Sequence, residues 1–298
     1  MGKKTLFVII VAIIVIIAAV VILSASFPST FSFGEKIAVI KLEGTISSSG
    51  SFLPVAQANP KTINGLLGKA EKDPTVRAVL LEINSPGGSP VASDEIAAKI
   101  ESMNKTVVAY IGDVGASGAY WIASSSDKIV AHPLAITCSI GAFTTSADLS
   151  EFFEKIGFNY TTIKSGELKD IGSPFRPLAP KEKEILQKLI DQVQQEFIDK
   201  VKTNRGLSDY QVSKISDGRP CLGKEAVELG LADKTGTKED AIVLIEEIEN
   251  LKKPRIIEFS QEEDLFGAAF GASLTKAFYA LGFGVGQGLK EPSNNIIS

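Results

Sequence analysis

The sequence predicts an α/β fold with a largely parallel sheet. After residue 36, short apolar runs typical of buried strands alternate with segments of helical periodicity. Two of the runs end in glycine-rich turns, at 84–89 and 115–118. Strands and helices taken in turn at this spacing form parallel sheets with right-handed crossovers. The expected strands are Ile37–Leu42, Ala78–Ile83, Thr106–Ile111, Lys128–Ala131 and Tyr160–Ile163.

Helices are expected between and after these strands. A long apolar stripe begins at Pro180, which suits a first helical turn, and ends at Gly206, which favours a helix end. The charged residues 181–184 are expected to form the solvated first turn of that helix. Ser93 is the expected N-cap of a helix that ends near Met103. The remaining expected helices are Asn64–Glu71, Glu225–Leu229 and Glu239–Ile248.

Composition excludes several function classes. With 298 residues, 44% of them hydrophobic, the chain can bury one sizeable core. A net charge of −4 provides no basic field, so a nucleic-acid partner is not expected. The sequence has no phosphate loop or metal-ligand cluster, so no cofactor is expected. Cys138 and Cys221 lie far apart without metal spacing, and we expect two separate, half-buried apolar residues and no disulfide framework.

The N-terminus contains a candidate membrane anchor. Leu6 to Leu23 is an unbroken apolar run that would make about 27 Å of helix, close to the hydrocarbon thickness of a bilayer. Two lysines precede the run and no basic residue follows until Lys36, which predicts a cytoplasmic N-terminus and an extracytoplasmic catalytic domain at the cell membrane. The alternative is a signal peptide cleaved near Ser24–Ser26. The expected segments are a tip and transmembrane helix at 1–24 and a linker at 25–35.

The two glycine-rich turns are the candidate catalytic loops. Ser117 follows a strand and precedes a short helical segment, while Gly87 and Gly88 follow the neighbouring strand. Adjacent glycines allow positive φ and bring backbone N–H groups close to a ligand, so they can donate to an oxyanion. Each motif has a simpler explanation, an N-cap serine or a plain turn. Together, two such loops can converge on one carbonyl.

The general base is the remaining requirement. His132, the only histidine, ends a strand and precedes a proline, so a structural or surface role is expected and a Ser-His-Asp triad is excluded unless it moves into place. A lysine can act as base if it is neutral, which requires its surroundings to lower its pKa from about 10.4 by about 2 to 3. Lys164 and Lys169 are the candidates, on a loop after the last expected strand.

Six segments, in this order and spacing, resemble the short form of signal peptide peptidase A, a membrane-anchored relative of the Clp protease and crotonase folds. The resemblance covers about residues 37–236. It implies a fold of repeated β-β-α units, with a protease domain at 36–258 and a Gly/Phe-rich extension at 259–298. The segments are Ile37–Ile46, Asn84–Gly88, Ala116–Tyr120, Ile136–Gly141, Lys164–Arg176 and Gly223–Asp233.

The resemblance assigns roles to five residues of this chain. It makes Ser117 the nucleophile and Lys169, within Gly-x-x-Lys-Asp-Ile, its general base. It makes Gly88 and Gly118 the donors of the oxyanion N–H groups. Ser139 matches a family serine that helps to hold the lysine. No metal or other cofactor takes part in this chemistry.

Two positions depart from the family pattern, and one lysine receives no role. Family members often have glycine where this chain has Cys138 and Ala119, which leaves the local packing open and the chemistry unchanged. Lys164 becomes a flanking residue.

The expected function is a membrane-anchored serine endopeptidase that degrades signal peptides or other peptides in or near the membrane. In the family, protomers assemble into rings or domes, and the serine and lysine of one site can come from adjacent subunits; the expected partners are therefore peptides, membrane lipid and further copies of the chain. One alternative is the related membrane-bound branch that cuts stomatin-like partners, although Lys-Asp-Ile-Gly-Ser-Pro favours the first family. The other is a non-catalytic scaffold, against which Ser117, Lys169 and the double glycine argue.

The C-terminal segment from Asp264 to Lys290 combines phenylalanines with many glycines. Glycine makes an isolated helix costly, by about 1 kcal/mol each relative to alanine. The segment is expected either to pack on its own domain, or to lie on the membrane surface or on a neighbouring subunit.

Overall fold

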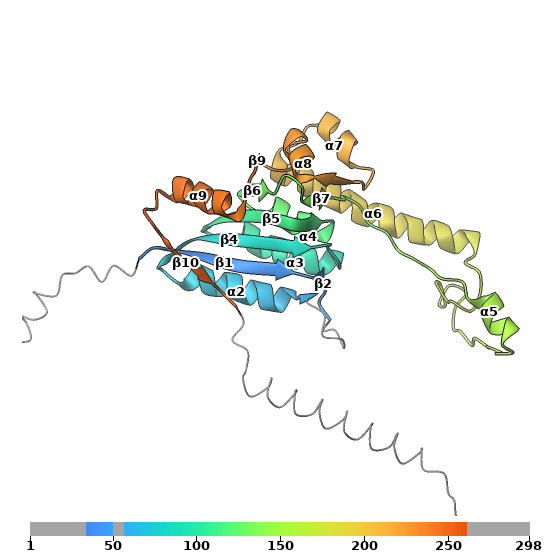
Figure 1. Cartoon of the computed structure of the whole chain (residues 1–298). Coiled ribbons are helices and arrows are strands. Elements are labelled where there is room, and N and C mark those ends of the chain that lie inside the picture. The colour runs from blue at the N-terminus through green and yellow to red at the C-terminus, as the bar shows by residue number, and fades with distance from the viewer. Residues whose placement is uncertain (1–33, 50–56, 261–298) are drawn as a thin grey trace, which may run out of the picture. The chain divides into compact units, whose positions relative to one another are not determined.

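The computed structural model describes residues 34–49 and 57–260 (Figure 1). The expected membrane anchor, its alternative cleavage site, the linker up to residue 33 and the segment 261–298 lie outside these residues. Within the two described ranges, no helix has both the length and the apolar character needed to cross a bilayer.

The main sheet is parallel along its central path, as the sequence predicts. Its strand order is β10-β1-β4-β5-β6-β9, and every neighbouring pair in this order is parallel. The strands are β1 (Lys36–Glu43), β4 (Val76–Ser85), β5 (Thr106–Ala116), β6 (Lys128–Ala131), β9 (Lys234–Thr235) and β10 (Arg255–Glu258). A small second sheet pairs β2 (Thr45–Ile46) with β3 (Gln57–Ala58).

Two short strands extend the sheet beside the end of β5. The first, β7 (Ile136–Cys138), pairs in parallel with the last residues of β5, so that Cys138 lies opposite Ala116. The second, β8 (Pro220–Leu222), is antiparallel to β7. This extension places residues 138 and 139 next to the turn that follows β5, where Ser117 lies.

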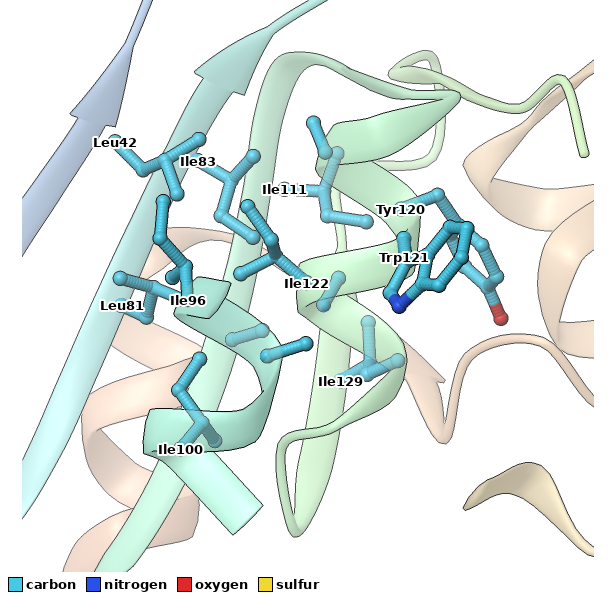
Figure 2. Packing of buried hydrophobic residues seen from close by; sticks show 14 of the residues in the cluster. Leu42, Leu81, Ile83, Ile96, Ile100, Ile111, Tyr120, Trp121, Ile122 and Ile129 are labelled. Carbon is cyan, nitrogen blue, oxygen red and sulfur yellow. The ribbon is translucent and has the colours of Figure 1, made fainter. Parts of the chain in front are cut away.

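Helices cover both faces of the sheet and bury separate apolar clusters. One cluster joins the strands to α2 (Pro60–Lys72), α3 (Pro90–Glu101) and α4 (Gly118–Ser124), and the other joins them to α9 (Lys238–Glu249). Figure 2 shows the first cluster, in which Ile83 and Ile111 from the strands pack near Ile96 and Ile122 from the helices. Successive strand residues alternate between the clusters because side chains of a strand point to opposite faces. The remaining helices are α5 (Ser150–Lys155), α6 (Pro180–Arg205), α7 (Asp209–Ile215) and α8 (Gly223–Glu228).

The expected ends of α6 are confirmed and the expected N-cap of α3 is wrong. The long helix begins at Pro180 and ends before Gly206, whose φ of 62° is left-handed. In α3 the cap is Ser89, whose Oγ accepts a hydrogen bond from Ala92 N at 3.3 Å. Ser93 is buried inside this helix, and its hydroxyl donates to Ser89 O. Pro90 starts the helix earlier because its fixed φ suits the first turn.

The expected strand Tyr160–Ile163 does not form. These residues belong to the segment 142–179, which we call the arm and which contains α5. Tyr160 stacks on Phe175 with ring centroids 3.8 Å apart, and Phe153 and Phe158 pack around the same ring. A short apolar run therefore serves an aromatic cluster in the arm instead of a sheet.

The expectation of two unpaired cysteines is also wrong. Cys138 and Cys221 form a disulfide that joins β7 to β8, with Cα atoms 5.5 Å apart. The partners are 83 residues apart in sequence, and the antiparallel pairing of the two strands brings them together. Both residues are buried, more fully than the half-buried positions expected, and they form a cross-link.

Candidate active site

Ser117 occupies a sharp turn between β5 and α4. Its φ of 53° and ψ of −125° are unusual for a residue with a side chain, and such backbone strain is concentrated at functional sites. Although Ser117 is the N-cap of α4, its side chain makes no capping hydrogen bond within the described residues. The turn is fixed by the backbone, since Ser117 N donates to Cys138 O at 2.9 Å and Trp121 N donates to Ser117 O at 3.0 Å. The hydroxyl is therefore free for another role.

The double glycine lies directly against this turn. A Cβ on Gly87 would be 2.7 Å from Gly118 N and 2.9 Å from Ser117 Cβ, and one on Gly118 would be 3.3 Å from Gly88 N. Gly88 also approaches β2 so closely that a Cβ would overlap the carbonyl oxygen of Ile46. Only glycine fits these contacts, and they bring the two expected oxyanion donors together.

The N–H groups of Gly88 and Gly118 are available to a ligand. Within the described part of the chain neither donates a hydrogen bond, whereas Gly87 N donates to Ser85 Oγ and Ser89 N donates to Ile46 O. The first N–H groups of a helix lack intrahelical partners, which explains the free amide of Gly118 at the start of α4. Two unpaired N–H groups beside a serine can stabilise an oxyanion.

Two cavities adjoin Ser117 and Gly88. The larger, of about 650 Å³, also reaches Ser139, Gln194 and Asp217. The smaller, of about 310 Å³, lies toward α6 and has a mostly apolar lining, which includes Trp121, Ile190, Val193 and Phe197. An extended peptide that places a carbonyl at Ser117 would thus have an apolar cavity beside it for a side chain.

Ser139 lines the larger cavity together with Ser117. Its φ is 53°, and its N–H donates to Arg219 O at 3.0 Å, which fixes it next to the disulfide. Asp217 and Gly218 form another part of its wall, and a Cβ on Gly141 would be 3.2 Å from Gly218 Cα. Sequence analysis did not identify this wall; the Asp-Gly turn signal at 217–218 was the available clue.

Lys169 lies on the arm and lines neither cavity. The backbone N–H of Lys169 donates to Gly166 O at 3.2 Å in a tight turn, and the side chain of Lys169 is exposed. The structure of one chain therefore brings together Ser117, Gly88, Gly118 and Ser139, but it does not place Lys169 beside them. His132 is also absent from both linings, and its Nδ1 accepts a hydrogen bond from Leu134 N.

The turn after Lys169 is held by an ion-pair cluster that sequence analysis missed. Arg176 bonds to both Asp170 and Glu182, and Glu182 is buried, with 3% of its surface exposed. The expected solvated first turn of α6 is thus wrong at Glu182, although its neighbours Lys181 and Lys183 are exposed. Four charged residues in a row gave no signal that one of them has an arginine partner.

Comparisons with known proteins identify the family of this chain. The model of Peptidase family S49 matches residues 99–252. A relative from Methanocaldococcus jannaschii, whose name describes a protease, is 39% identical over 266 residues. The match covers 87% of this chain and 83% of the relative. "Protease 4" of Haemophilus influenzae is 36% identical over 78% of this chain and 38% of its own length. "Serine protease SPPA, chloroplastic" of Arabidopsis thaliana is 32% identical over 75% of this chain and 33% of its own length.

A solved structure supports the fold alone. A mutant of a membrane-bound stomatin-specific protease superposes with a TM-score of 0.50 at 15% identity, over 77% of this chain and 99% of its own. The similarity extends along the parallel-rich α/β architecture, which is a Clp protease/crotonase-like fold.

Proposed function

Because this chain belongs to peptidase family S49 and is a serine peptidase, we propose that it is a membrane-anchored endopeptidase that uses a Ser117–Lys169 dyad. One observation carries the proposal: the uncapped hydroxyl of Ser117 lies on a strained turn beside the unpaired N–H groups of Gly88 and Gly118. A nucleophile and two oxyanion donors are the parts that acyl transfer requires from this half of the site.

In the proposed mechanism, neutral Lys169 takes the proton of Ser117 Oγ as the oxygen attacks the scissile carbonyl. Gly88 and Gly118 donate hydrogen bonds to the oxyanion that forms. The ammonium of Lys169 then gives its proton to the leaving amine, and the acyl-enzyme remains on Ser117. Water, activated by the same lysine, hydrolyses the ester. Ser139 helps to hold the lysine amine in place.

The lysine and the serine of one site come from two copies of the chain. Support comes from the exposed position of Lys169 on the arm and from its absence from both cavity linings. The arm also carries exposed apolar side chains, including Phe143, Phe152 and Ile163, the last 97% exposed. A second copy would bury this apolar surface. Figure 1 shows α5 beyond the end of α6 that lies farther from the main sheet.

The substrates are peptides in or near the membrane, such as signal peptides. The mostly apolar lining of the smaller cavity suits the side chains of such peptides, and Leu6–Leu23 would tether the enzyme at the bilayer. The catalytic domain lies on the extracytoplasmic side, because Lys3 and Lys4 precede the apolar run.

A fluorophosphonate probe tests the nucleophile directly. The full-length protein in detergent or liposomes should be labelled at Ser117, and Ser117→Ala should not be labelled. If the wild type is not labelled and does not cleave a lipid-embedded signal peptide, the result would favour a non-catalytic scaffold over an enzyme.

Mixing inactive variants tests the shared site. Ser117→Ala and Lys169→Ala should each be inactive alone, whereas co-assembly of the two should restore a fraction of the activity, because some sites then combine an intact serine with an intact lysine. No recovery in mixed assemblies, verified by two different affinity tags, would place both residues in one chain.

A further inference from the structure

The turn that carries Lys169 is tied to the start of α6 by a cluster of four charged side chains. Arg176 bonds to Asp170 through two pairs of atoms, Nε to Oδ2 at 3.0 Å and Nη2 to Oδ1 at 2.8 Å. The same guanidinium bonds to Glu182 at 2.8 Å and 2.5 Å. Lys164 adds a bond of 2.7 Å to Asp170 Oδ1. Two positive and two negative charges therefore balance in the cluster that includes Asp170, the residue after the expected base.

Glu182 fixes this cluster to the helix. It is the buried member, and its carboxylate also accepts a hydrogen bond from Ala179 N at 2.9 Å, next to the start of α6 at Pro180. Bonds from Arg176 hold the pKa of Glu182 down to about 2, with a further contribution from Ala179 N. Bonds from Arg176 and then Lys164 lower the pKa of Asp170 well below its usual range. Both carboxylates are thus charged at neutral pH.

Asp170 is the residue next to Lys169, and its charge matters for a lysine that must be neutral. An uncompensated carboxylate nearby stabilises an ammonium and so opposes loss of the proton. Arg176 and Lys164 supply the compensation. Apart from Lys169, the other charged groups between residues 164 and 184 are Glu167 and Lys181, which pair at 3.5 Å, and Lys183 and Glu184; all four are exposed.

We propose that Arg176 is a positioning residue for the base, which anchors the Lys169–Asp170 turn to α6 and cancels the field of Asp170 at the lysine amine. This inference rests on the proposed Ser117–Lys169 dyad. Arginine suits the role because its planar fork can bond two carboxylates at once, which the ammonium of a lysine cannot do with the same geometry.

The test is the rate of fluorophosphonate labelling of Ser117 as a function of pH, in the full-length assembly. Arg176→Gln and Lys164→Gln each leave the cluster with one excess negative charge, so the midpoint of the alkaline rise should move up by about 0.5 to 1 pH unit. Asp170→Asn leaves one excess positive charge, and the midpoint should move down by a similar amount. Shifts of opposite sign cannot arise from loosening of the arm alone.

Conservative and control variants separate charge from anchoring. Arg176→Lys keeps the charge and loses the fork, so it should retain the wild-type midpoint with a slower maximal rate. Lys181→Gln removes a positive charge of the exposed pair instead and should leave the midpoint within about 0.2 of the wild type. If Arg176→Gln does not fold because Glu182 loses its partner, Lys164→Gln and Asp170→Asn still provide the two opposite shifts.

The outcomes distinguish this inference from the dyad itself. If Lys169→Ala is labelled as fast as the wild type, the dyad is refuted, and the role of Arg176 with it. If Lys169→Ala is not labelled but the charge variants all keep the wild-type midpoint, the dyad stands and only the charge-cancelling role of Arg176 is overturned.

Discussion

Two regions of the chain are built in different ways. The corner is the turn at Ser117 with the double glycine Gly87–Gly88 against it, and the arm, residues 142–179, carries Lys169. The corner lies on strands whose apolar side chains are buried on both faces, and backbone hydrogen bonds, the disulfide and close glycine contacts fix it. The arm has an exposed turn held by side-chain ion pairs and by aromatic rings. One chain therefore fixes the proposed nucleophile and oxyanion donors in place, whereas the proposed base lies at a surface.

The largest expected effect is loss of activity without loss of stability. Ser117→Ala and Lys169→Ala should each lower peptide cleavage by at least about 10³-fold, because each removes a reacting group. Their melting temperatures should stay within about 2 °C of the wild type, since Ser117 makes no side-chain bond in the described residues and Lys169 is exposed. Turnover of a fluorogenic peptide and thermal unfolding measure the two quantities.

Two variants serve as controls for that result. Lys164→Ala should keep much of the activity at its own optimal pH, because Lys164 is not a reacting group and its loss only shifts the pH midpoint, and His132→Ala should behave as the wild type. An inactive Lys164→Ala beside an active Lys169→Ala would show that the base is assigned to the wrong lysine.

A matched pair of glycine substitutions compares the two regions directly. Gly88→Ala should lower stability by about 1 to 3 kcal/mol and activity by about 10²-fold or more, because its Cβ would overlap Ile46 O and disturb an oxyanion donor. Gly166→Ala on the arm should change either quantity little, since no described heavy atom lies within 4 Å of its Cβ position. Denaturant unfolding and steady-state kinetics are the measurements. A tolerated Gly88→Ala would contradict the close contact with β2.

Much of the corner could be predicted from sequence because its signals are local. A strand followed by small residues predicts the turn at Ser117, and adjacent glycines predict the approach of a second backbone. The disulfide could not be predicted, because its partners meet only through the pairing of β7 with β8. The burial of Glu182 depends in the same way on how the arm folds back to α6.

The arm was predicted less well for a related reason. Its apolar run at 160–163 has the periodicity of a strand, but no neighbouring strand is present among the described residues to receive it, and the aromatic ring of Phe175 packs there instead. In the proposed function, the position of Lys169 relative to Ser117 is a property of an assembly, which no pattern in one chain encodes.

A third prediction concerns the disulfide behind the corner. Cys138→Ser with Cys221→Ser should lower the free energy of unfolding by about 2 to 4 kcal/mol, because the unfolded chain regains the freedom of a long loop. Activity should fall by a smaller factor than in Gly88→Ala, since Cys138 O still accepts from Ser117 N through the backbone. Chemical denaturation with and without a dithiol reductant measures the effect. The double variant should be insensitive to the reductant, and a wild type equally insensitive under unfolding conditions would mean that the cross-link is absent.

The smallest expected effect is a local loosening of the arm in acid. The pKa values of Asp170 and Glu182 are lowered in the folded protein by bonds from Arg176, so their contribution to stability is fully present above their unfolded pKa values of about 4 and is lost as pH falls toward 2. Hydrogen exchange, corrected for intrinsic rates, should therefore show amides at 168–176 losing protection between about pH 4 and pH 2. Amides of β4 and β5 in the same sample provide the reference, because apolar burial holds those strands and does not titrate. In Asp170→Asn the arm should already exchange faster at pH 6 and depend less on acid. Equal acid dependence in the arm and the strands would mean that the ion pairs do not hold the arm, and the contrast between the two regions would then lie in exposure alone.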